Sequence, residues 1–278
     1  MDLHNPISRA AQLLGEAEAL LITAGAGMGV DSGLPDFRGT EGFWNAYPPY
    51  RNLGLRFEEL ASPRWFRDDP ELAWGFYGHR LNLYRSTPPH PGFEILRRWG
   101  QRMARGVRIF TSNVDGHFQR AGFAEDEVHE VHGSIHHAQC LKECGIGVFS
   151  GAEFQVPIDM ATLRAAELPR CPGCGSLVRP NILMFGDWEW DDSRTELQRR
   201  RQDRWRDEVD GRRLVVIELG AGTAVPTVRR YSEVVGVACK ASLIRINVRE
   251  PGVPAGNIGL AMGALAGLKA IQAELDRR

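Results

Sequence analysis

Short apolar runs alternate along this chain with segments that have helical periodicity. Residues 19–22 form a continuous apolar run, and residues 107–111, 214–219 and 242–246 have the same character. Such runs are typical of strands buried on both faces of a parallel sheet. Strands that alternate with amphipathic helices predict an α/β fold.

The helical segments begin at recognisable caps. Asn5-Pro6 and Asp69-Pro70 place a capping side chain before a proline at the first helical position, and Ser62-Pro63 has the same form. We predict helices from 6, from 63, over 70–86, over 92–103, over 192–209 and over 260–275. Residues 87–91, TPPHP, must be a loop. An alternating strand is expected over 128–133.

A glycine-rich loop follows the first apolar run directly. Gly25, Gly27 and Gly29 lack a Cβ, so backbone N–H groups can approach a pyrophosphate closely. A plain tight turn is the alternative, since GxG after a strand is common. Pro35 interrupts where a dinucleotide-binding dehydrogenase would continue into a helix.

The whole stretch GAGMGVDSGLPDFRG closely resembles the signature of the sirtuins, which are NAD-dependent protein deacylases. The resemblance implies that Gly25, Ala26 and Gly27 bind NAD. It also implies that a mobile loop closes over the cofactor and contains Asp36, Phe37 and Arg38.

Polar residues follow the second apolar run, where ligands bind in open α/β sheets. Asn113 and Asp115 are an Asn/Asp-capped turn in one interpretation. In the other they match the sirtuin Thr-Gln-Asn-x-Asp motif, which contacts the nicotinamide ribose and the nicotinamide pocket. Ser112 stands where that motif has Gln, and Phe118 where it has His, so a ribose contact from Ser112 is lost or made through water.

His132 is the candidate catalytic base. It precedes Cys140 by eight residues, which is the offset between the sirtuin catalytic histidine and the first zinc cysteine. His129, His136 and His137 lack this match and are expected to be structural or surface residues.

Four of the five cysteines have metal-ligand spacing. Cys140 and Cys144 form C-x3-C, and Cys171 and Cys174 form C-x2-C around Pro-Gly. Four thiolates in two tight turns predict one structural, tetrahedral Zn²⁺ site without an open position. Cys239 is expected only to pack.

Residues 179–187 resemble the sirtuin segment that pairs with the acylated peptide as an added strand. The residues implied in substrate binding are Ile182, Phe185, Gly186 and Asp187. Trp188 and Trp190 depart from the family pattern.

A second glycine loop follows the run at 214–219. Gly220, Ala221 and Gly222 occupy the place of the sirtuin Gly-Thr-Ser, and Asn247 matches an asparagine that recognises the adenosine ribose. These residues complete the expected NAD site. Arg249 stands where an acid is common.

Ala61, Tyr77 and Arg80 match in type and spacing the set that marks sirtuins acting on succinyl- and malonyl-lysine. Tyr77 and Arg80 are three residues apart on a helix, so both can face one pocket. A guanidinium can bind a carboxylate through two hydrogen bonds. The alternative is a surface arginine beside a packed tyrosine.

Composition limits the partners and the location. The chain has 278 residues, 43% of them hydrophobic, and a net charge of −1, so bulk charge gives no reason to expect nucleic acid or an anionic membrane as a partner. No signal peptide or membrane-length apolar run is apparent, so the cytoplasm is the expected location. The sequence gives no indication of an oligomeric state.

We therefore predict a Rossmann-like parallel-sheet domain with a smaller inserted domain, made of a helical module and a zinc ribbon. Residues 1–40, 88–134 and 180–278 would form the first, and 41–87 and 135–179 the second.

By resemblance, the acyl oxygen of acyl-lysine attacks NAD, nicotinamide leaves, and His132 acts as general base for the ribose hydroxyl, giving lysine and O-acyl-ADP-ribose. Asn113 and Asp115 would orient the ribose and the nicotinamide. The alternatives are an ADP-ribosyltransferase or NAD glycohydrolase on the same scaffold, and a catalytically silent NAD-binding protein.

Overall fold

A six-stranded parallel sheet forms the larger part of the protein, whose computed structural model describes residues 5–35 and 54–278. Every neighbouring pair of strands is parallel, which confirms the predicted Rossmann-like α/β fold. In spatial order the strands are β11 (Ile258–Leu260), β10 (Ser242–Ile246), β9 (Leu214–Leu219), β1 (Ala19–Ala24), β2 (Val107–Thr111) and β3 (Val128–Glu130).

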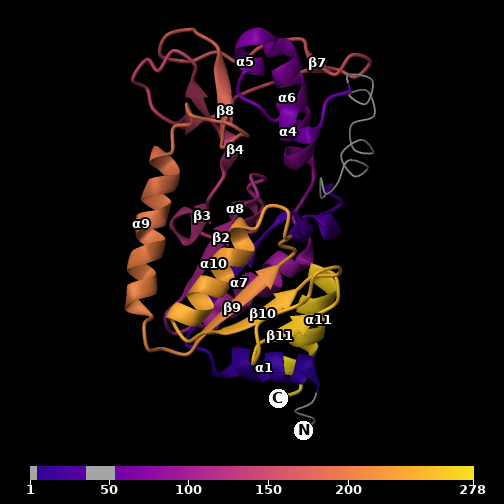
Figure 1. Ribbon diagram of the computed structural model, residues 1–278, viewed down its shortest axis with the longest axis vertical. Helices are drawn as coiled ribbons and strands as arrows, with labels where there is room; N and C mark the ends of the chain where they lie inside the picture. The colour runs from indigo at the N-terminus through magenta and orange to yellow at the C-terminus, as the bar shows by residue number, and fades with distance from the viewer. Residues whose placement is uncertain (1–4, 36–53) are drawn as a thin grey trace.

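Helices cover both faces of this sheet, and the side chains of β1 show why its sequence is apolar throughout. Leu20 and Ile22 pack with α1 (Pro6–Glu16), α7 (Pro91–Arg102) and α11 (Ala264–Leu275). Ala19 and Leu21 point to the opposite face, which α9 (Ser193–Glu208) and α10 (Thr227–Ala238) cover (Figure 1). A strand covered on both faces has no polar side to present.

The strand order reverses between β1 and β9. From β1 the chain moves outward through β2 to β3, and after the inserted segments it returns beside β1 as β9 and moves out on the other side. Ligands bind at such a reversal, beyond the carboxyl ends of the strands. The two glycine loops follow β1 and β9, so both lie at this point.

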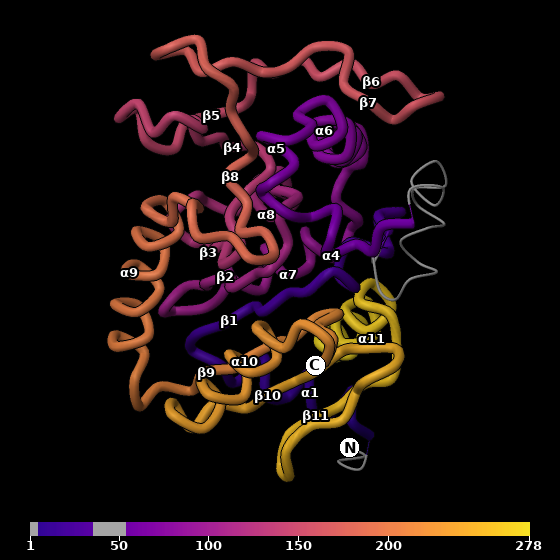
Figure 2. The backbone as a smooth tube through the Cα atoms, turned by 45° about the horizontal axis from the view of Figure 1, so that its top comes forward, coloured from indigo at the N-terminus to yellow at the C-terminus, as the bar shows by residue number. Residues whose placement is uncertain are grey.

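A second unit lies beyond the carboxyl ends of the large sheet (Figure 2). Its three-stranded antiparallel sheet has the order β5 (Phe149–Ser150), β4 (Gly133–Cys140) and β8 (Val178–Ile182). Its other elements are α4 (Phe57–Leu60), α5 (Trp65–Asp68), α6 (Pro70–Ser86) and the hairpin of β6 (Ile158–Asp159) and β7 (Arg164–Ala165). The unit has its own core, which includes Phe66, Trp74, Tyr77, Ile135 and Val178.

The remaining short elements are α8 (His117–Arg120) and the 3-10 turns η1 (Ala26–Met28), η2 (Val30–Ser32) and η3 (Glu125–Glu127). Within the two described stretches, no helix combines the length and the apolar character needed to cross a bilayer.

Several predicted boundaries were wrong, among them the end of the loop expected over 87–91, because α7 already begins at Pro91. The strand expected over 128–133 ends at Glu130, and His132 lies in the turn before Gly133, whose φ is +76°. The helix expected from 260 begins at Ala264, because residues 258–260 pair with β10 instead. The helix expected after Ser62-Pro63 begins at Trp65, preceded by Arg64 in helical conformation rather than by a capping side chain.

Candidate functional site

The two glycine loops touch each other at the reversal of the strand order. The N–H of Gly25 donates to Leu219 O at 3.0 Å, and the N–H of Gly27 donates to Gly220 O at 3.1 Å. A Cβ on Gly25 would lie 2.8 Å from the Cα of Ala221, and one on Gly27 would lie 2.7 Å from the Cα of Gly220. Glycine is therefore required here for the close approach of two loops, in addition to any ligand.

Asn113 and Asp115 are fixed by the backbone at the end of β2. Thr111 Oγ1 donates to Ala24 O and accepts from the N–H of Asn113, each at 3.0 Å. Asn113 Nδ2 donates to Gly25 O at 3.0 Å, so this side chain links the β2 loop to the first glycine loop. Asp115 is buried, and its Oδ1 accepts from the N–H of His117 at 2.9 Å.

His132 lies against the β2 loop. The N–H of Val131 donates to Thr111 O at 2.9 Å, which brings the turn containing His132 beside Ser112. Burial lowers the pKa of His132 below its ordinary value of 6.5, and a hydrogen bond to the Ser112 backbone partly opposes this. The imidazole is therefore neutral at neutral pH and able to accept a proton.

A single cavity of about 640 Å³ connects these elements. The predicted NAD-site residues that line it are Gly25, Ala26, Ser112, Asn113, Asp115, His132, Ala221 and Gly222. The predicted substrate residues that line it are Ala61, Tyr77, Arg80, Ile182 and Phe185. Residues from seven separate parts of the chain therefore meet at one space, and its volume is that of a small-molecule site.

Gly27, Gly220, Asn247, Gly186 and Asp187 do not line this cavity. Asp36, Phe37 and Arg38 lie outside the described residues.

The second glycine loop is held from behind by Asn247. The Nδ2 of this buried side chain donates to Ala221 O at 2.7 Å, and its Oδ1 accepts from the N–H groups of Arg249 and Glu250, both at 3.0 Å. Glu250 in turn accepts from Thr223 through the N–H at 3.1 Å and through Oγ1 at 2.5 Å. Asn247 thus shapes the loop, and its contact with a ribose stays a prediction.

Sequence reasoning missed Thr223, Arg249 and Glu250 as cavity residues. These residues follow β9 and β10 at the carboxyl edge of the sheet, and this position could have predicted that they line a ligand site.

Ala61, Tyr77 and Arg80 all line the cavity. Arg80 is only 8% exposed and Tyr77 1%, so Arg80 is not a surface arginine. Burial raises the pKa of Tyr77 to about 12, so its hydroxyl keeps its proton.

The segment after β8 forms one wall of the cavity and is tied to both units. The N–H of Leu183 donates to His132 O, and the N–H of Phe185 donates to Ala61 O, both at 3.0 Å. Asp187 is fully buried in an ion pair with Arg179, and one of its oxygens accepts from the N–H of Met184 at 3.2 Å. Asp187 therefore shapes this wall from inside the protein.

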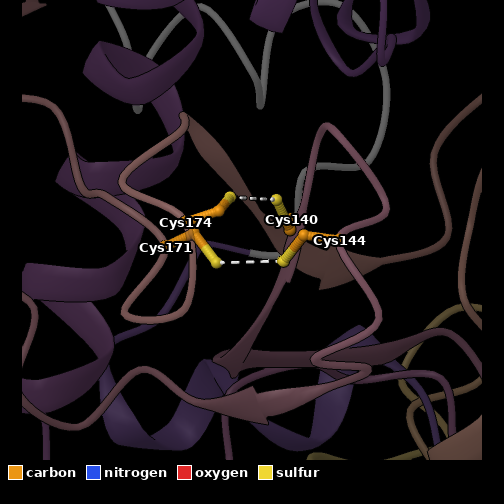
Figure 3. Close-up of side chains that lie close together, drawn as sticks. All are labelled: Cys140, Cys144, Cys171 and Cys174. Carbon is orange, nitrogen blue, oxygen red and sulfur yellow. Dashed lines mark hydrogen bonds between the residues drawn. The ribbon is translucent and has the colours of Figure 1, made fainter.

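The four cysteines face one another in two pairs (Figure 3). The sulfur atoms of Cys140 and Cys174 lie 3.6 Å apart, as do those of Cys144 and Cys171, and all four lie within 4.8 Å of one another. Bonds of about 2.3 Å to a tetrahedral zinc ion require sulfur atoms about 3.8 Å apart, so the set fits one structural Zn²⁺. Cys239 is buried elsewhere, as expected.

Comparison with known proteins agrees with this geometry. The profile of the Sir2 family matches residues 25–203. An NAD-dependent protein deacylase of Thermococcus kodakarensis is 35% identical over 189 residues, which are 65% of each chain. The mitochondrial NAD-dependent protein deacylase sirtuin-5 of Canis lupus familiaris is 32% identical over 63% of this chain and 58% of its own. The matched part is thus just under two thirds of the first relative's length.

Solved structures match over nearly the whole chain. A mutant Sir2 homologue in complex with ADP-ribose has a TM-score of 0.73 and 27% identity, over 100% of this chain and 98% of its own. A Sir2 homologue in complex with NAD has a TM-score of 0.72 and 27% identity, over 97% of this chain and 94% of its own.

Proposed function

Because the chain belongs to the Sir2 family, we propose that it is an NAD-dependent protein-lysine deacylase that transfers an acyl group from lysine to ADP-ribose and releases nicotinamide. One observation carries the proposal. The loops expected to bind NAD, the imidazole of His132 and the residues expected to bind acyl-lysine all line the same cavity.

The residues present fit NAD at the reversal of the strand order. The loops after β1 and β9 line the cavity through Gly25, Ala26, Ala221 and Gly222, while Asn113 and Asp115 are held at the end of β2. When bound, NAD supplies the ribose carbon and hydroxyls that receive the acyl group, together with the nicotinamide leaving group. Asn113 and Asp115 would orient the ribose and the nicotinamide.

His132 would act as general base. Burial lowers its pKa, so the ring is neutral at neutral pH, and a ring nitrogen would take the proton of a ribose hydroxyl. The segment from Leu183 to Phe185 would exclude water and hold the extended peptide, since it walls the cavity beside His132.

The acyl group would carry a carboxylate, as succinyl and malonyl groups do. Arg80 supports this part of the proposal, because it lines the cavity and a guanidinium can bind a carboxylate through two hydrogen bonds. Ala61 leaves room for the longer acyl chain.

The test is to incubate the protein with NAD and matched acetyl-, malonyl- and succinyl-lysine peptides, and to weigh the products by mass spectrometry. We expect deacylated peptide and O-acyl-ADP-ribose in equal amounts. Arg80→Met should abolish desuccinylation and spare any deacetylation, and equal loss of both would refute the pocket assignment. Consumption of NAD without any peptide would favour an NAD glycohydrolase, and ADP-ribosylated protein would favour a transferase.

Acyl-lysine proteins are thus the proposed partners, without direct binding of nucleic acid. We also propose a cytoplasmic location, which fractionation of cells that express the tagged chain would test.

A further inference from the structure

Tyr84 lies beside Arg80 in the cavity, at a position that neither the composition nor the resemblance pointed to. It is four residues further along α6, so the two side chains share one helix face. Arg80 Nε donates to Tyr84 Oη at 3.2 Å, and Arg80 Nη2 donates to the same oxygen at 2.9 Å. Tyr84 is 4% exposed, so the hydroxyl fixes one edge of the guanidinium inside the protein.

Three aromatic rings surround the guanidinium. The Cζ of Arg80 lies 5.4 Å from the ring centre of Phe76, 5.8 Å from that of Tyr77 and 5.5 Å from that of Tyr84. These distances permit cation–π attraction, and the rings exclude water from the cation. Because folding has already immobilised this side chain, a ligand that binds it loses little additional side-chain entropy.

The Tyr84 hydroxyl accepts both arginine bonds and therefore still has its own hydrogen to donate. Among the described residues, the hydrogen bonds of this hydroxyl are those from Arg80. Burial raises the pKa of Tyr84, the nearby Arg80 cation opposes the rise, and the Asp115 carboxylate adds to it. The hydroxyl therefore keeps its proton at neutral pH.

Tyr84 is linked both to residues expected to bind the acyl group and to residues expected to bind NAD. Its side chain contacts Arg80, and the Asp115 carboxylate, which lines the same cavity, contributes to the raised pKa of its hydroxyl. Its backbone carbonyl accepts from Arg120 Nη1 at 2.5 Å, which anchors this end of α6 to α8 of the large-sheet unit.

We propose that Tyr84 is a specificity-determining residue, which orients the Arg80 guanidinium and donates its own hydroxyl hydrogen to the same carboxylate of an acidic acyl group. The inference rests on the proposed deacylase function and extends it. An acetyl group has no such carboxylate, so it would form neither bond. Selectivity for acidic acyl-lysines would then depend on Tyr84 as well as on Arg80 and Tyr77.

The test compares Tyr84→Phe with the natural chain on succinyl- and acetyl-lysine peptides of one sequence. The substitution removes only the hydroxyl, so we expect the KM for the succinyl peptide to rise about ten-fold, with a smaller change in kcat. Kinetics with the acetyl peptide should change less than about two-fold. Tyr231→Phe is the matched control, because Tyr231 is a half-buried tyrosine whose hydroxyl accepts from Gln202 Nε2 at 3.3 Å and which does not line the cavity.

The other outcomes of these measurements would overturn the inference or the proposed function. Equal losses on both peptides would show that Tyr84 is only structural, and unchanged kinetics on both would show that its hydroxyl is irrelevant; either result overturns the inference. A natural chain that removes acetyl but not succinyl groups would overturn the inference and the acyl class, and leave the deacylase proposal intact. If no peptide is deacylated, the proposed function fails, and calorimetric titration with the succinyl-lysine peptide still tests whether Tyr84→Phe weakens binding.

Discussion

His132 illustrates how the fold sets the chemistry of a single residue. An exposed histidine would be partly protonated near its ordinary pKa of 6.5, and a protonated imidazole cannot act as a base. Burial lowers the pKa of His132, so the neutral ring persists at lower pH. The Ser112 backbone limits this effect, because it raises the pKa.

We expect kcat/KM for the acyl peptide to stay constant at neutral pH and to fall only below pH 6.5, as His132 takes up a proton. His132→Gln should lower kcat by about two to four orders of magnitude. The measurement is a pH–rate profile, with His129→Gln as the control because His129 is buried in β3 and does not line the cavity. An unchanged acidic limb in His132→Gln would remove the residue from the mechanism.

At the scale of elements, the strands of the large sheet were readable from the sequence, and the site was readable in part. The runs at β2, β9 and β10 are each followed by a polar residue or glycine, and their limits were predicted to the residue. The strand β11 was not, since three residues containing Gly259 form a strand only because β10 lies beside them.

The same limit applies to the site. Asn113 and His132 belong to motifs, whereas the roles of Tyr84, Glu250 and Asp187 depend on neighbours distant in sequence or on side-chain contacts that periodicity does not reveal. The predicted domain boundaries stay predictions.

The wall formed after β8 depends on the buried pair of Arg179 and Asp187, whose side chains are 1% and 0% exposed. We expect Asp187→Asn to lower the free energy of unfolding by about 3 kcal/mol, because it leaves a buried cation without its counter-charge. The KM for the peptide should rise more than the KM for NAD. The measurement is urea unfolding together with steady-state kinetics.

Asp203→Asn is the control for that experiment. Asp203 pairs with Arg199 on the surface of α9, where the side chains are 32% and 52% exposed, so its loss should cost less than about 1 kcal/mol. If both variants lowered the free energy of unfolding equally, the buried pair would stabilise the protein no more than the exposed pair does.

The zinc cluster supports a strand that also serves the site. Cys140 ends β4, and β4 begins at Gly133, directly after His132. Cys174→Ser should bind less than the one zinc ion per chain that we expect for the natural sequence. Its thermal midpoint and its activity should also fall, because the metal no longer holds the end of β4. Metal analysis and thermal unfolding measure these effects. Cys239→Ser should keep its zinc, and a retained ion in Cys174→Ser would contradict the four-thiolate site.

For the whole molecule, the histidines make stability dependent on pH. Burial lowers the pKa of six of them, namely His79, His90, His129, His132, His136 and His137. For His129 and His137 the pKa falls to about 4. Between these values and the ordinary 6.5 the unfolded chain binds more protons than the folded one, so stability must decrease as pH falls. Glu130 has the opposite effect on the pH dependence of stability, because burial raises its pKa. It is one group, whereas six histidines act in the other direction.

We therefore expect the thermal midpoint to fall by roughly 5 °C or more between pH 7 and pH 5, since each kcal/mol lost lowers the midpoint of a chain of this size by about 2–4 °C. This window separates the histidines from the carboxylates with lowered pKa, such as Glu94 and Glu196, which protonate only below their ordinary 4.5. Calorimetric scans at intervals of half a pH unit measure the slope, and His129→Gln should make it shallower because one buried titrating group is gone. A midpoint that is flat or rises over this range would show that the folded chain binds at least as many protons as the unfolded one, so that the imidazoles as a group do not have lowered pKa values.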